Sequence, residues 1–240
     1  MQATRFARTC FVRAAVGKVF FSTTTGMLAS TPPKRGALVV LEGCDRCGKS
    51  TQARMLSEAL NKSNLTAKTM QFPERSTAIG GIINSYLCKE LELDDHCVHL
   101  LFSANRWELQ GSMAKALEAG TTLIVDRYAF SGVAFTAAKE GFNLDWCKNP
   151  DRGLPEPDLV LYLDLAVEAA ARRGAYGEER YERTDFQQRV YDNYQQLKAD
   201  DWKVLDADTS IDNLHSQILS LVENTISSCA DKPIGKLWTK

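Results

Sequence analysis

The feature that most constrains this chain is a glycine-rich loop at residues 43–51, which matches the pattern G-x-x-x-x-G-K-[ST]. An apolar run at residues 37–41 precedes the loop, and Met55, Leu56 and Leu60 follow it at helical spacing. A strand, a glycine loop and a helix in this order form a phosphate-binding loop, where backbone N–H groups and the positive helix end surround phosphate oxygens. The loop therefore predicts that the chain binds a nucleoside triphosphate.

Two side chains of this loop have the chemistry for phosphoryl transfer. Lys49 can reach the transferring phosphates, and the Ser50 hydroxyl can bind Mg²⁺. The residues expected around the phosphates of ATP are Gly43, Cys44, Asp45, Arg46, Cys47, Gly48, Lys49, Ser50 and Thr51. Cys44 and Cys47 form a C-x-x-C pair, but no second pair lies at zinc spacing, so we expect no structural metal here. The loop alone does not identify the phosphate acceptor.

The chain of 240 residues alternates apolar runs with helical patterns. The expected strands are residues 37–42, 67–72, 121–126, 158–164 and 203–206. This alternation predicts an α/β fold with three layers, in which helices flank a parallel five-stranded sheet. We expect one domain at residues 35–240, with its ligands beyond the carboxyl ends of the strands. The longest apolar runs are too short to cross a membrane as helices.

Residues 1–34 differ from the rest, because they are basic, rich in hydroxyl groups and free of acidic residues. This composition favours an organelle transit peptide. A disordered tail, or an extension upstream of a second start at Met27, is the alternative. We expect a mitochondrial protein if translation begins at Met1, and a cytosolic or nuclear one if it begins at Met27. The remaining chain is acidic and has no basic stripe, which argues against binding to nucleic acid.

A second motif is the apolar strand at residues 121–126, which ends in Asp126 and is followed by Arg127. Enzymes with a phosphate-binding loop use an aspartate in this place to hold Mg²⁺. Arg127 would then lie beside the metal and the phosphates. The alternative is an ion pair at the end of the strand.

The second predicted strand ends at residues 72–75, where Pro73 ends the strand and turns the chain. Arg75 would then point into the crevice, where its guanidinium can bind a phosphate through two hydrogen bonds. The alternative is a surface arginine paired with Glu74.

Residues 101–108 read as a helix on which Phe102 and Arg106 share one face. A ring beside a guanidinium can stack on a planar base and bind its edge. The alternative is a core phenylalanine beside a solvated arginine.

A charged stretch at residues 171–182 follows one predicted helix and precedes another. It suits a lid that closes over phosphates and excludes water, although it can also be a solvated connection between helices. The lid residues expected to act are Arg172, Arg173, Arg180 and Glu182.

These motifs together predict two phosphate-bearing ligands. Arg75 and Arg127 supply more positive charge than one triphosphate needs beside Lys49 and Mg²⁺. A phosphate acceptor is already anionic near neutral pH, so transfer to it requires charge neutralisation and in-line placement rather than a strong base. We therefore expect phosphoryl transfer from ATP to a nucleoside monophosphate, with Lys49, Arg46, Asp126 and Arg127 in the reaction.

The chain from about residue 36 to residue 238 closely resembles the eukaryotic thymidylate kinases. The resemblance rests on the Asp45–Arg46 pair, residues 72–75, residues 101–108, the segment 126–132 and residues 180–182. It implies phosphorylation of dTMP to dTDP in the synthesis of dTTP, with Mg²⁺ and in a homodimer. The implied dTMP-binding residues are Asp45, Phe72, Arg75, Phe102, Arg106, Arg127, Ser131, Gly132, Phe135 and Tyr181.

The resemblance also implies individual roles. Asp45 would accept a hydrogen bond from the 3′-hydroxyl of the acceptor's sugar, and Arg46 would reach the transferring phosphate. Gly132 and Phe135 would crowd the sugar and disfavour a 2′-hydroxyl. On the acceptor side, Arg75 and Arg127 would hold the dTMP phosphate, Phe102 would stack on thymine, Arg106 would bind a thymine carbonyl and Tyr181 would close over the acceptor. On the donor side, Arg173, Asp206 and Ala207 would lie near adenine. Ser50 and Asp126 would bind Mg²⁺.

Rival functions stay open at this point. A deoxynucleoside kinase needs a carboxylate base just after the second strand, and Glu74 can be proposed for it, although Arg75 would then have no acceptor phosphate to bind. Another nucleoside monophosphate kinase is also an alternative. A guanine-specific switch protein would carry an N-K-x-D segment late in the fold, and the sequence has none.

Overall fold

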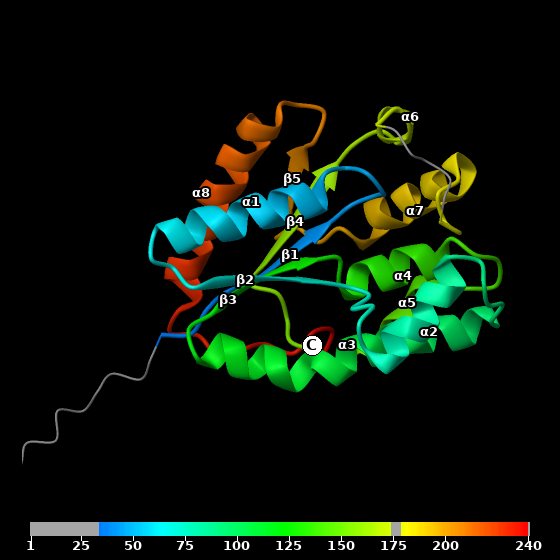
Figure 1. Ribbon diagram of the computed structural model, residues 1–240, viewed down its shortest axis with the longest axis horizontal. Coiled ribbons are helices and arrows are strands. Elements are labelled where there is room, and N and C mark those ends of the chain that lie inside the picture. The colour runs from blue at the N-terminus through cyan, green and yellow to red at the C-terminus, as the bar shows by residue number, and fades with distance from the viewer. Residues whose placement is uncertain (1–33, 174–178, 240) are drawn as a thin grey trace, which may run out of the picture. The chain divides into compact units, whose positions relative to one another are not determined.

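Five parallel strands form the centre of the fold (Figure 1). The computed structural model describes residues 34–173 and 179–239. The strands are β1 (Leu38–Glu42), β2 (Ala67–Gln71), β3 (Thr122–Asp126), β4 (Leu159–Asp164) and β5 (Lys203–Asp206), in the order β2-β3-β1-β4-β5. Each neighbouring pair is parallel. The predicted sheet is confirmed, and each strand end lies within one residue of its expected place.

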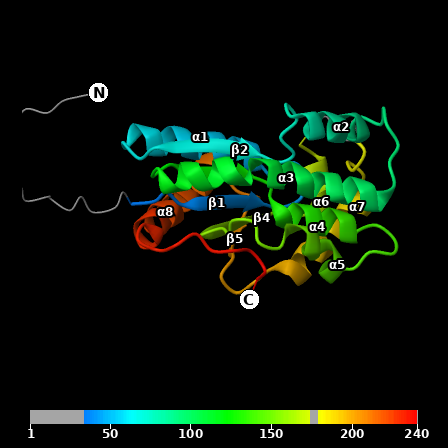
Figure 2. The same ribbon diagram turned by 90° about the horizontal axis from the view of Figure 1, so that it is seen from below.

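Helices cover both faces of this sheet. They are α1 (Lys49–Lys62), α2 (Ala78–Leu87), α3 (Asp95–Glu118), α4 (Ala129–Ala137), α5 (Leu144–Lys148), α6 (Val167–Ala171), α7 (Thr184–Leu197) and α8 (Ile211–Cys229), with a 3₁₀ turn at η1 (Asn149–Asp151). Helices α1 and α8 pack on one face, and α3, α4 and α7 pack on the other. Figure 2 shows α2 beside α3, where a small separate apolar cluster joins the two helices.

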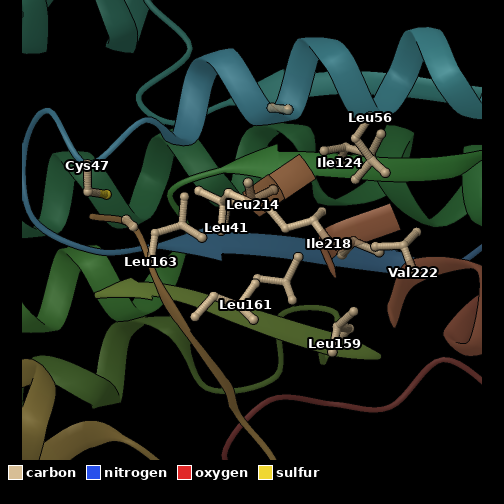
Figure 3. Packing of buried hydrophobic residues seen from close by; sticks show 14 of the residues in the cluster. Leu41, Cys47, Leu56, Ile124, Leu159, Leu161, Leu163, Leu214, Ile218 and Val222 are labelled. Carbon is tan, nitrogen blue, oxygen red and sulfur yellow. The ribbon is translucent and has the colours of Figure 1, made fainter. Parts of the chain in front are cut away.

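The alternation of side chains along β1 explains why its sequence shows no polar alternation. Val39 and Leu41 point to the face of α1 and α8, where they pack near Leu56 and Ile218 (Figure 3). Their neighbours in the strand belong to the cluster on the opposite face. Since both faces are buried, every position of the strand is apolar until Glu42.

The sheet order places β1 between β3 and β4, with the phosphate loop at its carboxyl end. Among residues 34–173 and 179–239, no helix is long and apolar enough to span a membrane. The predicted N-terminal extension falls outside the described residues except for Lys34, and the centre of the predicted lid, residues 174–178, also lies outside them.

Candidate active site

One crevice of about 790 Å³ opens at the carboxyl ends of the strands. It brings together most of the residues predicted for the site, which are Asp45, Arg46, Cys47, Gly48, Lys49, Ser50, Thr51, Phe72, Arg75, Phe102, Arg106, Asp126, Arg127, Ser131, Gly132, Phe135, Arg173, Tyr181, Glu182 and Ala207. Five predicted residues do not line it, namely Gly43, Cys44, Arg172, Arg180 and Asp206. The structure thus gathers motifs that are far apart in the sequence into a single site.

The phosphate loop holds its lysine inside the site. Gly48 has a φ of 99° and forms the N-cap of α1, which begins at Lys49. The Nζ of Lys49 donates to the carbonyl oxygens of Gly43 at 3.1 Å and Cys44 at 2.7 Å, and the residue is 5 % exposed. Gly43 and Cys44 therefore contribute carbonyl oxygens behind the lysine rather than crevice-lining side chains.

The two cysteines of the loop are buried on opposite sides of it. Cys44 joins the apolar cluster that contains α7, and its Sγ lies 3.9 Å from the carbonyl oxygen of Gln187. Burial raises the pKa of the Cys44 thiol to about 12. Cys47 joins the other cluster, and its Sγ lies 3.4 Å from the Nζ of Lys49. Both side chains therefore pack as small apolar groups.

Ser50 and Asp126 both line the crevice and are in direct contact. The Ser50 hydroxyl donates to Oδ2 of Asp126. The other carboxylate oxygen, Oδ1, is buried and has no hydrogen-bond partner among the described residues. A hydroxyl beside a carboxylate with one unused oxygen is the donor set that Mg²⁺ prefers, so these two residues fit the metal.

Arg127 lies between the phosphate loop and α4. Its backbone has a φ of 67°, its Nη1 donates to Gly43 O and Ser131 Oγ at 3.2 Å each, and its Nη2 pairs with Asp45. Burial disfavours the charged guanidinium, but Asp45 and neighbouring acidic groups outweigh it and raise the pKa of Arg127. Arg127 is therefore a fixed positive charge at the centre of the site.

Arg75 follows β2 and is bound from two sides. Its Nη2 pairs with Glu179 at 2.8 Å, and its Nη1 donates to Oδ1 of Asn84 at 2.8 Å. The alternative of a pair with Glu74 is wrong, since the Glu74 carboxylate accepts from the Ser76 hydroxyl and N–H instead. Arg75 lines the crevice and Glu74 does not.

Arg106 is buried rather than solvated. It is 1 % exposed, and it forms a two-point ion pair with Asp151 in which Nε and Nη2 donate over 3.0 and 2.6 Å. A Cβ added at Gly132 would lie 2.7 Å from Nη2, so Gly132 makes room for the guanidinium. Phe102 lines the same crevice. No local pattern marks Asp151, which is the last residue of η1 and lies 45 positions from Arg106 in the sequence.

Some residues that flank segment 174–178 line the crevice, and others contact different parts of the protein. Arg173 donates to Ala207 O at 2.8 Å, and Glu182 pairs with Arg46 at 2.9 Å. The Tyr181 ring stacks on Phe186 with centroids 5.0 Å apart. Three residues predicted for the lid or the adenine side lie elsewhere: Arg180 pairs with Glu92 and covers the Tyr86 ring, Arg172 is exposed, and Asp206 accepts from the N–H of Asp208.

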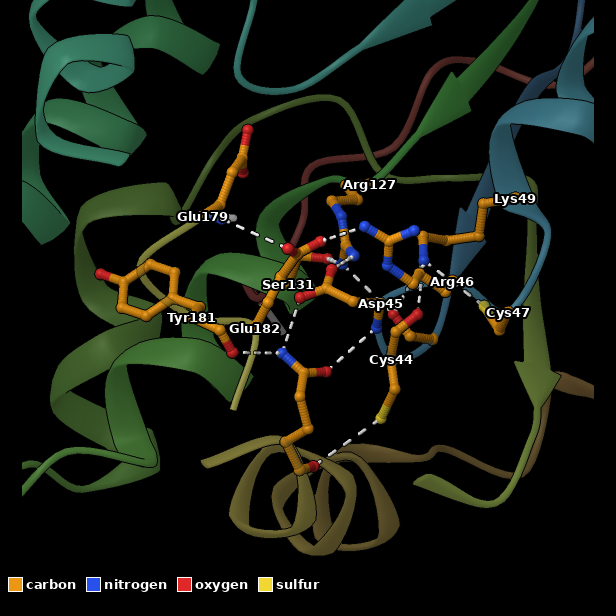
Figure 4. Close-up of polar contacts among 12 residues, drawn as sticks. Cys44, Asp45, Arg46, Cys47, Lys49, Arg127, Ser131, Glu179, Tyr181 and Glu182 are labelled. Carbon is orange, nitrogen blue, oxygen red and sulfur yellow. Dashed lines mark hydrogen bonds and ion pairs between the residues drawn. The ribbon is translucent and has the colours of Figure 1, made fainter. Parts of the chain in front are cut away.

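Gln187 is a residue of this site that the sequence did not reveal. Its Nε2 donates to Oδ2 of Asp45 at 2.6 Å and to the Tyr181 carbonyl at 3.0 Å, and its Oε1 accepts the Asp45 N–H at 3.0 Å. Figure 4 shows Asp45, Arg127, Arg46 and Glu182 converging at this point. Gln187 lies in α7 directly after Phe186, and the apolar pattern of this helix predicts only that the helix packs on the core.

Comparisons with known proteins identify the family of this chain. A sequence profile described as "Thymidylate kinase" matches residues 41–218. Thymidylate kinases of Homo sapiens and Danio rerio are 55 % and 54 % identical over 208 residues, which cover 85 % of this chain and 98 % of each relative. A solved thymidylate kinase from Candida albicans superposes with a TM-score of 0.77 at 38 % identity, covering 84 % of this chain and 98 % of that one. The chain belongs to the thymidylate kinase family.

Proposed function

We propose that this crevice catalyses the reaction of the family, ATP-dependent phosphorylation of dTMP to dTDP, with ATP at the phosphate loop and dTMP between Arg75 and Arg127. The observation that carries this placement is the position of Arg127. Its guanidinium contacts Gly43 and Asp45 of the phosphate loop as well as Ser131 of α4. It can therefore hold an acceptor phosphate beside the phosphate of the donor.

The chemistry needs charge neutralisation and alignment. The dTMP phosphate is already an anion, so the site needs no strong base to activate it. Arg75 and Arg127 bind this phosphate, while Lys49 and Arg46 stabilise the charge that develops on the transferring group. Tyr181 and Glu182 line the same crevice, and we assign to them the exclusion of water from the acceptor.

We assign thymine recognition to Phe102 and Arg106. Phe102 presents a ring for stacking on the base. The two-point pair with Asp151 uses Nε and Nη2 of Arg106, and the remaining Nη1 is the donor assigned to a thymine carbonyl. Phe135, whose ring lies 5.1 Å from the Arg127 guanidinium carbon, bounds the sugar side.

Ser50 and Asp126 are the proposed ligands of Mg²⁺. The metal, when bound, neutralises charge on the β- and γ-phosphates of ATP. The unused Oδ1 of Asp126 supports this assignment. Asp126→Asn should weaken Mn²⁺ binding, measured by the electron paramagnetic resonance of that ion as a probe, and unchanged binding would contradict the assignment.

A deoxynucleoside kinase is the rival activity, and its base would be Glu74. Hydrogen bonds from the Ser76 hydroxyl and N–H lower the pKa of Glu74 and make it a weaker base. Its absence from the crevice lining also argues against that role. The deciding experiment is an ADP-release assay with ATP–Mg²⁺ and thymidine, dTMP, UMP or no acceptor. Turnover with dTMP alone is the expected result, and turnover with thymidine would support the rival.

We also propose a homodimer. Helices α2 and α3 expose Ile82, Leu100 and Trp107, and large apolar side chains on neighbouring helices are suited to a protein interface. Light scattering of the purified protein should give twice the chain mass of 26.7 kDa. A mass of one chain at micromolar concentration would contradict the proposal.

For localisation, we propose that residues 1–34 direct the product of the Met1 start to mitochondria, while a product begun at Met27 stays in the cytosol or nucleus. Fusing either form to a fluorescent protein tests this proposal. Identical distributions of the two fusions would overturn it.

A further inference from the structure

A buried carboxylate next to the phosphate loop has no part in the roles described so far. Glu42 is the last residue of β1 and is completely buried. Its Oε1 accepts the backbone N–H groups of Tyr128 at 2.9 Å and Ser131 at 3.1 Å. Its Oε2 accepts the hydroxyls of Ser131 at 2.5 Å and Tyr194 at 2.8 Å. Four donors thus converge on one side chain.

These contacts join two parts of the active site. Tyr128 and Ser131 belong to the start of α4, where backbone N–H groups have no partner inside the helix and where the helix dipole favours a negative charge. The carboxylate that satisfies them comes from β1, which leads directly into the phosphate loop. Glu42 therefore fixes the start of α4 relative to that loop.

The same network reaches Arg127. Nη1 of Arg127 donates to Ser131 Oγ, which is bonded to Glu42, and to the carbonyl oxygen of Gly43, the residue after Glu42. The guanidinium is therefore held between Ser131, which Glu42 binds, and Gly43, which follows Glu42 in the chain. The charge of Glu42 also contributes to the raised pKa of Arg127.

We propose that Glu42 is a positioning residue, which holds Ser131 and Arg127 on the acceptor side of the crevice in register with the phosphate loop. The inference rests on the proposed function, in which Arg127 binds the dTMP phosphate. Glu42 itself does not line the crevice and touches no ligand. In-line transfer depends on the placement of both phosphates, and a misplacement of about 1 Å can lower a rate by roughly 100-fold.

The test is Glu42→Gln, a substitution of equal size. Glutamine Oε1 can still accept the two backbone N–H groups, while its Nε2 donates to the hydroxyls of Ser131 and Tyr194, which can act as acceptors. The variant therefore keeps the size of the side chain, but it removes the charge and reverses the hydrogen bonds to the two hydroxyls. One of these, Ser131 Oγ, also accepts from Nη1 of Arg127. We expect the Kd for dTMP to rise at least about tenfold and kcat to fall, with the Kd for ATP within about threefold of wild type.

A merely structural cap would behave differently. Asp94→Ala is the control, because the Asp94 carboxylate caps α3 by accepting the N–H groups of His96 and Cys97 and does not line the crevice. It should lower Tm while leaving kcat and both Kd values unchanged. The same pattern in Glu42→Gln, or equal weakening of dTMP and ATP, would overturn the proposal.

Tyr194→Phe tests the same network without changing Glu42. It removes one of the four donors and should raise the Kd for dTMP about twofold to fivefold. If Glu42→Gln does not fold, an unchanged Kd for dTMP in Tyr194→Phe overturns the inference.

Arg127→Ala separates the positioning role of Glu42 from the phosphate-binding role of Arg127. Normal dTMP binding by Arg127→Ala would refute the proposed role of Arg127, whereas its loss beside normal binding by Glu42→Gln would refute only the positioning role.

Discussion

Gln187 binds Asp45 at two points, through a donor to the carboxylate and an acceptor for the backbone N–H. The same side chain donates to the carbonyl of Tyr181. Gln187 is 1 % exposed, so these bonds form in a buried environment where an unpaired polar group is costly. A single amide in α7 thus fixes a residue of the phosphate loop and joins it to the segment over the acceptor.

Replacement of Gln187 tests this connection. Gln187→Ala removes a hydrogen bond to a charged group and should lower the free energy of unfolding by about 1.5–3 kcal/mol. The KM for dTMP should rise, because Asp45 loses a contact that fixes it. Urea unfolding and steady-state kinetics measure the two effects. Gln196→Ala is the matched control on the same helix. Within residues 34–173 and 179–239 its side chain makes one hydrogen bond, which is exposed and 3.5 Å long. Equal effects of the two variants would contradict the account.

The contact between Gly132 and Arg106 leads to a second prediction. Gly132→Ala would place a methyl group 2.7 Å from Nη2 of Arg106, which Asp151 holds in place. We expect a loss of about 1–3 kcal/mol in the free energy of unfolding and weaker dTMP binding. Gly111→Ala is the control, because nothing lies within 4 Å of the added methyl group on α3. The free energy of unfolding of Gly111→Ala should rise by about 0.4–1 kcal/mol. A similar rise for Gly132→Ala would contradict the prediction, because it would show that Arg106 moves freely.

A buried histidine predicts how stability depends on pH. His99 lies between the Thr136 hydroxyl at 2.8 Å and the Cys147 carbonyl at 3.0 Å, and burial together with the charge of Arg106 lowers its pKa to about 4. Between its unfolded pKa of about 6.5 and this folded value, only the unfolded chain binds the proton. His99 should therefore lower the free energy of unfolding by up to roughly 3 kcal/mol as the pH falls through this range.

Urea unfolding at pH 7.5 and pH 5 measures this dependence. His99→Gln keeps a donor for the Cys147 carbonyl and cannot titrate, so its loss of stability between the two pH values should be smaller than that of wild type. The carboxylates titrate in both proteins and their contribution cancels in the comparison. An equal loss in the two proteins would exclude His99 as the cause.

The sheet and the phosphate loop could be predicted from local sequence, because each leaves a local pattern. Strand β1 is an apolar run of a length typical of strands, and the loop has a fixed glycine and lysine spacing. Asp126 could be found in the same way, since it ends an apolar strand. The turn that Pro73 imposes predicts that Arg75 lies at the crevice, but no local pattern indicates its partner Glu179.

The buried polar partners could not be predicted. Asp45 and Gln187 are 142 positions apart, and Glu42 and Tyr194 are 152 positions apart. Such pairs have no sequence period, because they depend on how helices pack on the sheet. A buried arginine such as Arg106 also reads as a surface residue until its carboxylate partner is known. The sequence therefore revealed side chains assigned to ligands more readily than those that hold them in place.

The most direct test of the central claim, that the crevice binds two phosphate-bearing ligands at separate ends, is calorimetry of dTMP and ATP binding to Arg75→Ala. We expect dTMP binding to weaken by roughly 2–5 kcal/mol, because the variant loses a charge-assisted contact at the acceptor end, while ATP binding changes little. Arg54→Ala is the control, since Arg54 pairs only with Glu58 on the exposed side of α1 among the residues described. An equal loss of affinity for both ligands would contradict the claim.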